Sequence, residues 1–195
     1  MVALSVPIAI LFSYGRILNC KRAENLMKTL YLVRHAKSSW EHLFQDDFDR
    51  PLNERGRKDA PRMAKRLKER DIKPDLVLTS PAERALSTCM IMAERAGYPS
   101  SNILKDQRLY HASDEQLLKI VREFNDANDE VMIFCHNPGL TEFVNRLIRE
   151  PLTDNIPTCG VVCIKLPVTS WKEVTWENGD VRFYDYPKKG GKARK

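Results

Sequence analysis

The sequence predicts an α/β fold, a three-layer α/β/α sandwich with a mostly parallel sheet. Short apolar runs such as 29–33 and 130–135 are typical of strands buried on both faces. Segments with apolar residues at helical spacing alternate with these runs. The chain has 195 residues, 43% of them hydrophobic and 30% charged, which suits one compact domain and excludes disordered or collagen-like classes.

The first strand is predicted over 29–33 because this run is apolar and rich in strand formers. It ends at Arg34-His35, and the polar, irregular residues 36–52 are predicted to form a loop. A helix is predicted over about 57–70, where apolar residues recur at helical spacing, and Pro61 is tolerated there because it lies near the first turn.

The second strand is predicted over 74–79, and a helix start follows it. Ser80 is expected to be the N-cap, Pro81 to take the first helical position, and Glu83 to close a capping box. This helix is expected to end at Ala96, before Gly97.

The remaining elements continue the alternation. A third strand is predicted near 103–105, and a capping-box pattern at Ser113 opens a helix to about Phe124. The apolar run 130–135 is the fourth strand. Two further elements complete the sandwich, a helix over roughly 139–149 and a strand over 160–166.

A hairpin is predicted near the end of the chain. Residues 171–176 and 181–186 flank Asn178-Gly179, the dipeptide most typical of a tight turn between two antiparallel strands. We therefore expect these two segments to pair with each other.

The net charge of +6 is concentrated at the ends of the chain, because residues 188–195 contribute +5 and residues 1–27 contribute +2. We predict a domain over 27–187, a disordered basic tail over 188–195 and no nucleic-acid partner. Residues 1–26 are a doubtful N-terminal extension. The segment that begins at Met27 has the form of a protein start, and we predict translation from it against the alternative of a targeting segment.

Five scattered cysteines, an odd number without a C-x-x-C pair, argue against a disulfide framework or a zinc site. Cys89, Cys135 and Cys163 have apolar neighbours, as reduced and buried cysteines do. No apolar run approaches the roughly 18 residues of a membrane-spanning helix. The predicted location is therefore cytoplasmic, without a membrane partner.

Polar residues follow three of the predicted strands. Arg34 and His35 follow the first, Arg84 lies in the first turn of the helix after the second, and His136 follows the strand over 130–135. Ligands of α/β sheets bind outside the carboxyl ends of the strands, so we expect these four side chains to converge. Two guanidiniums match a tetrahedral oxyanion, and a helix start adds positive dipole, which predicts a phosphate site.

The two histidines suit a covalent mechanism. One imidazole can attack phosphorus and carry it as phosphohistidine, while the other donates a hydrogen bond to the phosphoryl oxygens in the transition state. This chemistry requires no metal and no other cofactor.

Three motifs resemble the histidine phosphatase superfamily, which has the phosphoglycerate-mutase-like fold. They are the segments 32–38, 79–85 and 135–139, which read LVRHAKS, TSPAERA and CHNPG. The short chain and the Arg-His-Ala opening are similar to SixA-type phosphohistidine phosphatases. The resemblance covers about 28–186.

The resemblance implies that His35 is the nucleophile and that Arg34, Arg84 and His136 are catalytic partners in the phosphate pocket. Lys37 and Asn137 are further candidates for binding phosphate or substrate, although a solvated lysine at a loop start is an equal alternative for Lys37.

The sequence assigns no general acid. Asn137 stands where one branch of the resembled family has an acidic proton donor, and another branch uses a glutamate in a loop that here spans 108–113. His111 in this loop is interpreted as a rim residue, and Asp114 and Glu115 as acids of a helix start. Asp46 or Asp47 could still swing into the pocket.

The missing acid bears on the substrate. An alcohol leaving group needs protonation, whereas imidazole, with a pKa of about 6.5, departs from phosphohistidine more readily. We therefore predict a metal-independent phosphatase that forms phospho-His35 and acts on phosphohistidine in a protein. The alternatives are a phosphomonoesterase for small metabolites such as sugar phosphates, and a non-catalytic module that binds a phosphorylated ligand.

Overall fold

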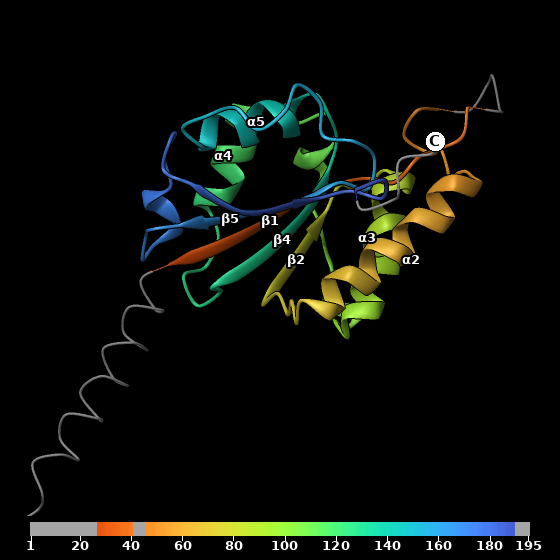
Figure 1. Ribbon diagram of the computed structural model, residues 1–195, viewed down its shortest axis with the longest axis horizontal. Coiled ribbons are helices and arrows are strands. Elements are labelled where there is room, and N and C mark those ends of the chain that lie inside the picture. Colours follow the sequence, from red (N-terminus) through yellow and green to blue (C-terminus); the bar gives the residue numbers. More distant parts are fainter. Residues whose placement is uncertain (1–26, 41–45, 190–195) are drawn as a thin grey trace, which may run out of the picture.

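A six-stranded sheet forms the centre of the molecule (Figure 1). The computed structural model describes residues 27–40 and 46–189. Three of the five neighbouring strand pairs are parallel, which confirms the predicted mostly parallel sheet. The strand order is β3-β2-β4-β1-β5-β6, with β1 at Lys28–Arg34, β2 at Leu76–Thr79, β3 at Leu104–Lys105, β4 at Glu130–Cys135, β5 at Val161–Leu166 and β6 at Asp180–Asp185.

Helices cover both faces of the sheet, so the predicted three-layer sandwich is confirmed (Figure 1). One face carries α2 (Glu54–Glu69) and α3 (Glu83–Ala96), and the other carries α4 (Asp114–Arg122) and α5 (Gly139–Leu147). Successive residues of β1 point into the two cores in turn, which explains why this strand is apolar throughout. Among the described helices, none is long and apolar enough to cross a membrane.

Helix α2 begins earlier than predicted. The Asn53 side chain accepts a hydrogen bond from the Gly56 amide at 2.9 Å and caps the helix before Glu54. Pro61 therefore lies in the second turn, and its expected place near the first turn is wrong. Gly56 is required here, because a Cβ atom at this position would lie 2.1 Å from the Lys37 carbonyl oxygen.

The start of α3 also differs from the prediction. The helix begins at Glu83 with Ala82 as its N-cap and without a side-chain cap, so the predicted Ser80 cap and capping box are wrong. The Ser80 side chain is instead fully buried, and its Oγ lies 2.8 Å from Nε2 of His136. The predicted end at Gly97 is confirmed, with a left-handed φ of 79°.

The predicted hairpin is wrong in its first strand. β6 pairs antiparallel with β5, and Trp171–Glu173 forms the short 3-10 helix η3. The physical reason is the Trp171 side chain, which is fully buried in the core between the sheet and α4. Gly179 precedes β6 and donates its amide to the Leu147 carbonyl at 2.8 Å, a close approach rather than a turn between paired strands.

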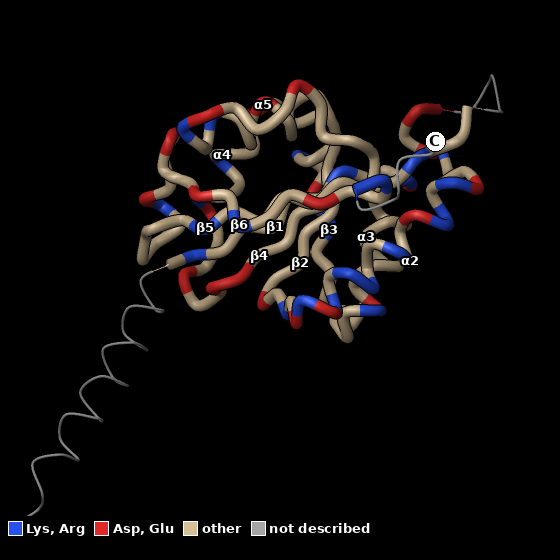
Figure 2. Tube along the Cα trace, viewed as in Figure 1, with Lys and Arg blue, Asp and Glu red and all other residues tan. Residues whose placement is uncertain are grey.

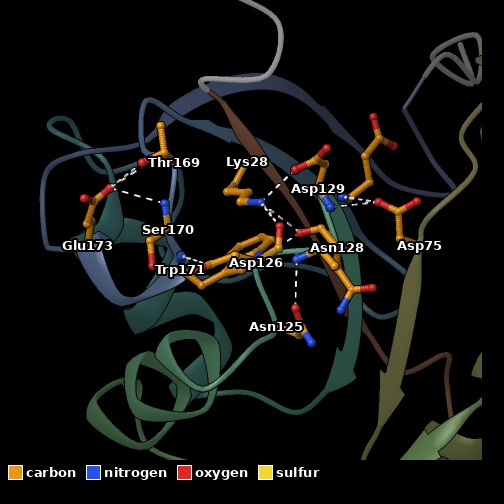
Figure 3. Close-up of polar contacts among 12 residues, drawn as sticks. Lys28, Asp75, Asn125, Asp126, Asn128, Asp129, Thr169, Ser170, Trp171 and Glu173 are labelled. Carbon is orange, nitrogen blue, oxygen red and sulfur yellow. Dashed lines mark hydrogen bonds and ion pairs between the residues drawn. The ribbon is translucent and has the colours of Figure 1, made fainter. Parts of the chain in front are cut away.

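A buried lysine ties the amino-terminal end of β1 to its surroundings (Figure 3). Lys28 Nζ donates to the Asp126 carbonyl at 2.5 Å and pairs with Asp129 Oδ1 at 2.7 Å. The Trp171 indole donates to the Asn128 carbonyl at 2.8 Å, and Lys28 Nζ lies 5.9 Å from the centre of this ring. This cluster joins β1, η3 and the segment before β4 at the end of the sheet away from the strand carboxyl ends.

We expect the Lys28→Met variant to lose about 1–3 kcal/mol of its free energy of unfolding, because the carbonyl groups around Nζ lose their donor. Urea denaturation measures this loss. The exposed Lys172, on η3, provides the control, since Lys172→Met is expected to change stability by less than about 0.5 kcal/mol. Equal losses in the two variants would contradict a structural role for the Lys28 cluster.

Candidate active site

The predicted site residues at the strand ends do converge. Arg34 ends β1 and pairs in register with Cys135, which ends the parallel neighbour β4. His35 and His136, the next residues along each strand, therefore lie side by side, with ring centroids 5.0 Å apart. Arg84, in the first turn of α3, lies close enough to act electrostatically on both rings.

His35 presents an unprotonated ring nitrogen. Its Nδ1 lies 2.8 Å from the Ala36 carbonyl oxygen, which can only accept, so Nδ1 carries the proton and Nε2 keeps its lone pair. Burial lowers the pKa of His35 to about 3 against the opposing Ala36 hydrogen bond, and Arg84, Arg34 and Arg50 lower it further. The ring is therefore neutral near pH 7 and suited to nucleophilic attack.

His136 is also held neutral. Burial lowers its pKa to about 2, and the neighbouring His35 and Arg84 act in the same direction. The Ser80 hydroxyl, which can donate or accept, lies 2.8 Å from Nε2, and Nδ1 has no hydrogen-bond partner among the described residues. Sequence reasoning missed Ser80 as a site residue because it was assigned to a helix cap, although its place directly after β2 was a usable signal.

Four buried side-chain atoms in the described part of the chain have no hydrogen-bond partner, and all belong to predicted site residues. They are Nε of Arg34, Nε of Arg84, Nδ1 of His136 and Oδ1 of Asn137. Buried polar atoms are nearly always paired in native proteins, so unpaired ones grouped around a neutral histidine indicate a place where a ligand supplies the partners. Two of these atoms are guanidinium donors, as an anion requires.

The side chains of Arg34 and Asn137 donate hydrogen bonds to the same two acceptors. Arg34 Nη1 donates to the Ile156 carbonyl at 2.6 Å and to Asn155 Oδ1 at 3.1 Å. The Asn137 side-chain amide donates to the same two groups, at 3.2 Å and 2.7 Å respectively. The segment before β5 thus positions both side chains. No local pattern in the sequence indicates that this segment contacts the site.

An aspartate forms an ion pair with Arg84. Asp47 Oδ2 accepts from Arg84 Nη2 at 2.8 Å and from the Tyr110 hydroxyl at 2.9 Å, and Oδ1 accepts from Arg50 Nη1 at 2.7 Å. His111 Nε2 lies 3.5 Å from Oδ2. Burial raises the pKa of Asp47, but the hydrogen bonds from Tyr110, Arg84 and Arg50 outweigh it and hold this pKa well below its usual range.

Asp47 is therefore a carboxylate near neutral pH and has no proton to give to a leaving group in this arrangement. Of the two aspartates considered as a mobile acid, Asp47 lies beside Arg84, whereas Asp46 Oδ1 accepts from the Phe48 amide at 3.0 Å. Arg50, which is also buried, was missed in the sequence and had no local signal.

Two of the remaining candidates lie at the margin. The Lys37 side chain is exposed and makes no hydrogen bond or ion pair with the described part of the chain. His111 is exposed as well, but its ring lies 6.0 Å from that of His136, which agrees with the interpretation as a rim residue. The structure thus joins Arg34, His35, Arg84, His136 and Asn137 but not Lys37.

The depressed pKa values predict a pH-dependent stability. Below pH 6.5 the unfolded chain protonates His35 and His136, while the folded protein does so only near pH 3 and pH 2. Acidification through this window therefore destabilises the native state, by up to about 1.4 kcal/mol per pH unit for each histidine. We expect urea titrations between pH 7 and 4 to show a shallower loss of stability in His35→Gln than in the wild type. Parallel pH dependences in the two proteins would count against a buried, neutral His35.

Comparisons with known proteins agree with this geometry. A family model, the histidine phosphatase superfamily (branch 1), matches residues 30–110. An uncharacterised chloroplastic protein of Arabidopsis thaliana is 30% identical over 157 residues, which cover 76% of this chain and 71% of that protein. A phosphoglycerate mutase of Schizosaccharomyces pombe is 39% identical over 82 residues, 41% of this chain and 39% of the mutase.

A solved structure extends the likeness over most of the chain. A crystal structure named as phosphohistidine phosphatase SixA, from Agrobacterium tumefaciens, has a TM-score of 0.70 at 27% identity and covers 82% of this chain and 98% of its own. The fold and the paired histidines and arginines thus define an enzyme of the phosphatase and mutase class. The chain belongs to the histidine phosphatase superfamily, as its motifs predict.

Proposed function

We propose that this enzyme is a cofactor-free phosphatase that forms phospho-His35 and removes the phosphoryl group from phosphohistidine in a protein. The observation that carries the proposal is the group of unpaired donors, Nε of Arg34, Nε of Arg84 and Nδ1 of His136, around a neutral His35. Three donors match the three phosphoryl oxygens that carry the charge during transfer.

In the first step, Nε2 of His35 attacks phosphorus as the bond to the substrate nitrogen breaks. The electron pair of that bond stays on the leaving imidazole, which takes a proton from solvent or already carries it. Arg34 and Arg84 hold the oxygens, and His136 donates from Nδ1. In the second step, water attacks phospho-His35, inorganic phosphate forms, and the pair of the broken P–N bond returns to Nε2.

The protonation state of Asp47 supports a P–N substrate. Its carboxylate accepts from Arg84, Arg50 and Tyr110, and these bonds hold its pKa below the usual range. On the proposal, the bonds from Arg50 and Tyr110 persist when the substrate takes the place of Asp47 on Arg84, so Asp47 does not serve as a general acid near pH 7. An alkoxide leaving group needs such an acid, and an imidazole leaving group does not.

The proposal includes the extent and location of the catalytic unit. Residues 27–187 contain every residue assigned to the site, and the tail over 188–195 takes no part in the two steps. Cys89, Cys135, Cys159 and Cys163 are free and buried, which supports a reducing compartment such as the cytoplasm.

A second candidate function rests on His111. This ring lies at the rim, with Nε2 3.5 Å from Asp47 Oδ2 and its centroid 6.0 Å from that of the His136 ring, and we propose that it donates a hydrogen bond to a leaving oxygen. A phosphomonoesterase for small metabolites is therefore the alternative. In that case His111→Gln lowers turnover of alkyl phosphates and spares p-nitrophenyl phosphate, whose leaving group needs little protonation.

The deciding experiment compares substrates. The full chain is given a phosphohistidine protein, p-nitrophenyl phosphate and sugar phosphates, with EDTA present and His35→Ala as the control. Fast P–N cleavage with slow ester hydrolysis is expected. Efficient hydrolysis of sugar phosphates would overturn the P–N assignment, and cleavage abolished by EDTA would overturn the cofactor-free mechanism.

A further inference from the structure

A basic groove runs along the free edge of β6, the last strand of the sheet. It is an open groove of about 560 Å³, and its cationic residues belong to α2, to the C-cap of that helix, to β6 and to the turn that follows β6. Figure 2 colours lysine and arginine along the trace. The lining residues of the groove are Arg66, Arg70, Arg182, Phe183, Tyr184, Asp185 and Lys189. Four cations thus face one carboxylate.

The charge of the groove is not balanced internally. Asp185 is buried and forms ion pairs with Arg66 at 2.8 Å and with Arg70 at 3.5 Å. Arg182 is exposed and makes no hydrogen bond or ion pair with the described residues. Lys189 donates only to the Tyr184 carbonyl, at 2.5 Å, so two cations remain for an external anion.

Aromatic rings hold the cations in place. The Arg70 guanidinium lies 4.6 Å from the Phe183 ring, and Lys189 Nζ lies 5.5 Å from the Tyr184 ring. Such contacts reduce the freedom of long side chains and keep the charges spaced along the strand. These contacts position Arg70 and Lys189, while Arg182 remains exposed beside them.

The groove reaches the same end of the sheet as the candidate active site. Asp185 is paired with Val161 of β5, and Val161 is paired with Val33, the residue before Arg34. Tyr184 is also close enough to Arg34 for the two to affect each other's pKa. At Asp185, two strand spacings separate the backbone of β6 from that of β1, about 10 Å, which three extended residues can span. Arg182 lies three residues before Asp185 on the same strand.

We propose that this groove binds an acidic segment of the phosphoprotein substrate, three to four residues from the phosphohistidine that enters the site. The inference rests on the proposed function, because it names the kind of protein on which that site acts. A small sugar phosphate cannot reach the active site and the groove at the same time. We therefore expect the groove to lower KM for a protein or peptide substrate and not for a metabolite.

Synthetic phosphohistidine peptides test the proposal. One carries glutamate at three and four positions on either side of the phosphohistidine, and the other carries glutamine there. For the full-length wild type we expect a KM roughly tenfold lower for the glutamate peptide, given two exposed charge contacts of about 0.7 kcal/mol each. Arg182→Glu/Lys189→Glu is expected to abolish this difference and to leave phosphoramidate turnover unchanged.

A matched double reversal provides the control. Lys105→Glu/Lys119→Glu makes the same change in net charge at exposed positions on β3, at the opposite edge of the sheet, and on α4. It is expected to keep the preference for the glutamate peptide. Equal KM values for the two peptides in the wild type, or equal effects of the two double variants, would overturn the proposal.

Binding separates this proposal from the proposed function. Fluorescence anisotropy is therefore measured with the same two peptides carrying a non-hydrolysable phosphohistidine analogue. The glutamate peptide is expected to bind roughly tenfold more tightly than the glutamine peptide, and Arg182→Glu/Lys189→Glu is expected to abolish this difference, even if P–N cleavage itself proves absent. If the wild type instead binds a DNA duplex more tightly than the glutamate peptide and the variant loses that binding, the groove is a nucleic-acid site and the proposal is wrong.

Discussion

The His35→Ala variant is expected to lose turnover by a factor on the order of 10⁴ or more, because the proposed mechanism passes the phosphoryl group through the imidazole of His35. His35 is the group whose Nε2 is free, since its Nδ1 is bonded to the Ala36 carbonyl. Initial rates on a phosphohistidine protein measure the loss.

A second measurement tests the covalent step directly. Wild-type enzyme quenched during turnover of a radiolabelled substrate is expected to carry label that is stable to alkali and labile to acid, as a phosphoramidate is. His35→Ala is expected to carry none, while it still binds inorganic phosphate through Arg34, Arg84 and His136. Label retained in the variant would place the nucleophile elsewhere.

The Arg84→Lys variant is expected to lower kcat/KM by about 10²–10³-fold, the usual cost of removing one preorganised donor from a charged transition state. The positive charge is kept, but a lysine cannot present two parallel donors to a phosphoryl group. We expect a weaker affinity for inorganic phosphate in parallel with the slower rate.

Arg108 offers a matched control for Arg84. It is an arginine in ion pairs with Asp106 and Glu123, at 2.8 Å each, outside the group of converging site residues. Arg108→Lys is therefore expected to leave kcat/KM within about twofold of the wild type. Comparable losses in the two variants would mean that Arg84 acts on the fold rather than on the phosphoryl group.

The strand-end residues could be predicted because the rule behind them is local. A buried strand is visible as an apolar run, and the carboxyl ends of parallel strands meet at one edge. Arg34-His35, His136 and Arg84 needed no knowledge of side-chain contacts. The same rule applied to β2 would have included Ser80, which was assigned to a helix cap by its Ser-Pro-x-Glu pattern alone.

The rest of the site depends on contacts between distant parts of the chain. Asp47 and Tyr110 are 63 residues apart, and Arg34 meets the Ile156 carbonyl 122 residues away. Likewise, an Asn-Gly dipeptide indicates a turn but not which strand β6 pairs with, and burial of Trp171 decided that. Tertiary packing overrides local patterns at such places.

The Asp47 contact has a consequence for the way phosphate comes and goes. Side-on recognition of a phosphoryl group by Arg84 uses Nε and one terminal nitrogen, and Asp47 already holds Nη2. On the proposed mechanism, the substrate therefore replaces Asp47 as the counter-ion of Arg84 instead of binding to an unpaired guanidinium. When inorganic phosphate leaves, the carboxylate returns and spares the arginine an unpaired, dehydrated state. On this mechanism, Asp47 and the phosphoryl group alternate as the anion bound to Arg84. The aspartate that the incoming substrate displaces therefore also helps inorganic phosphate to leave.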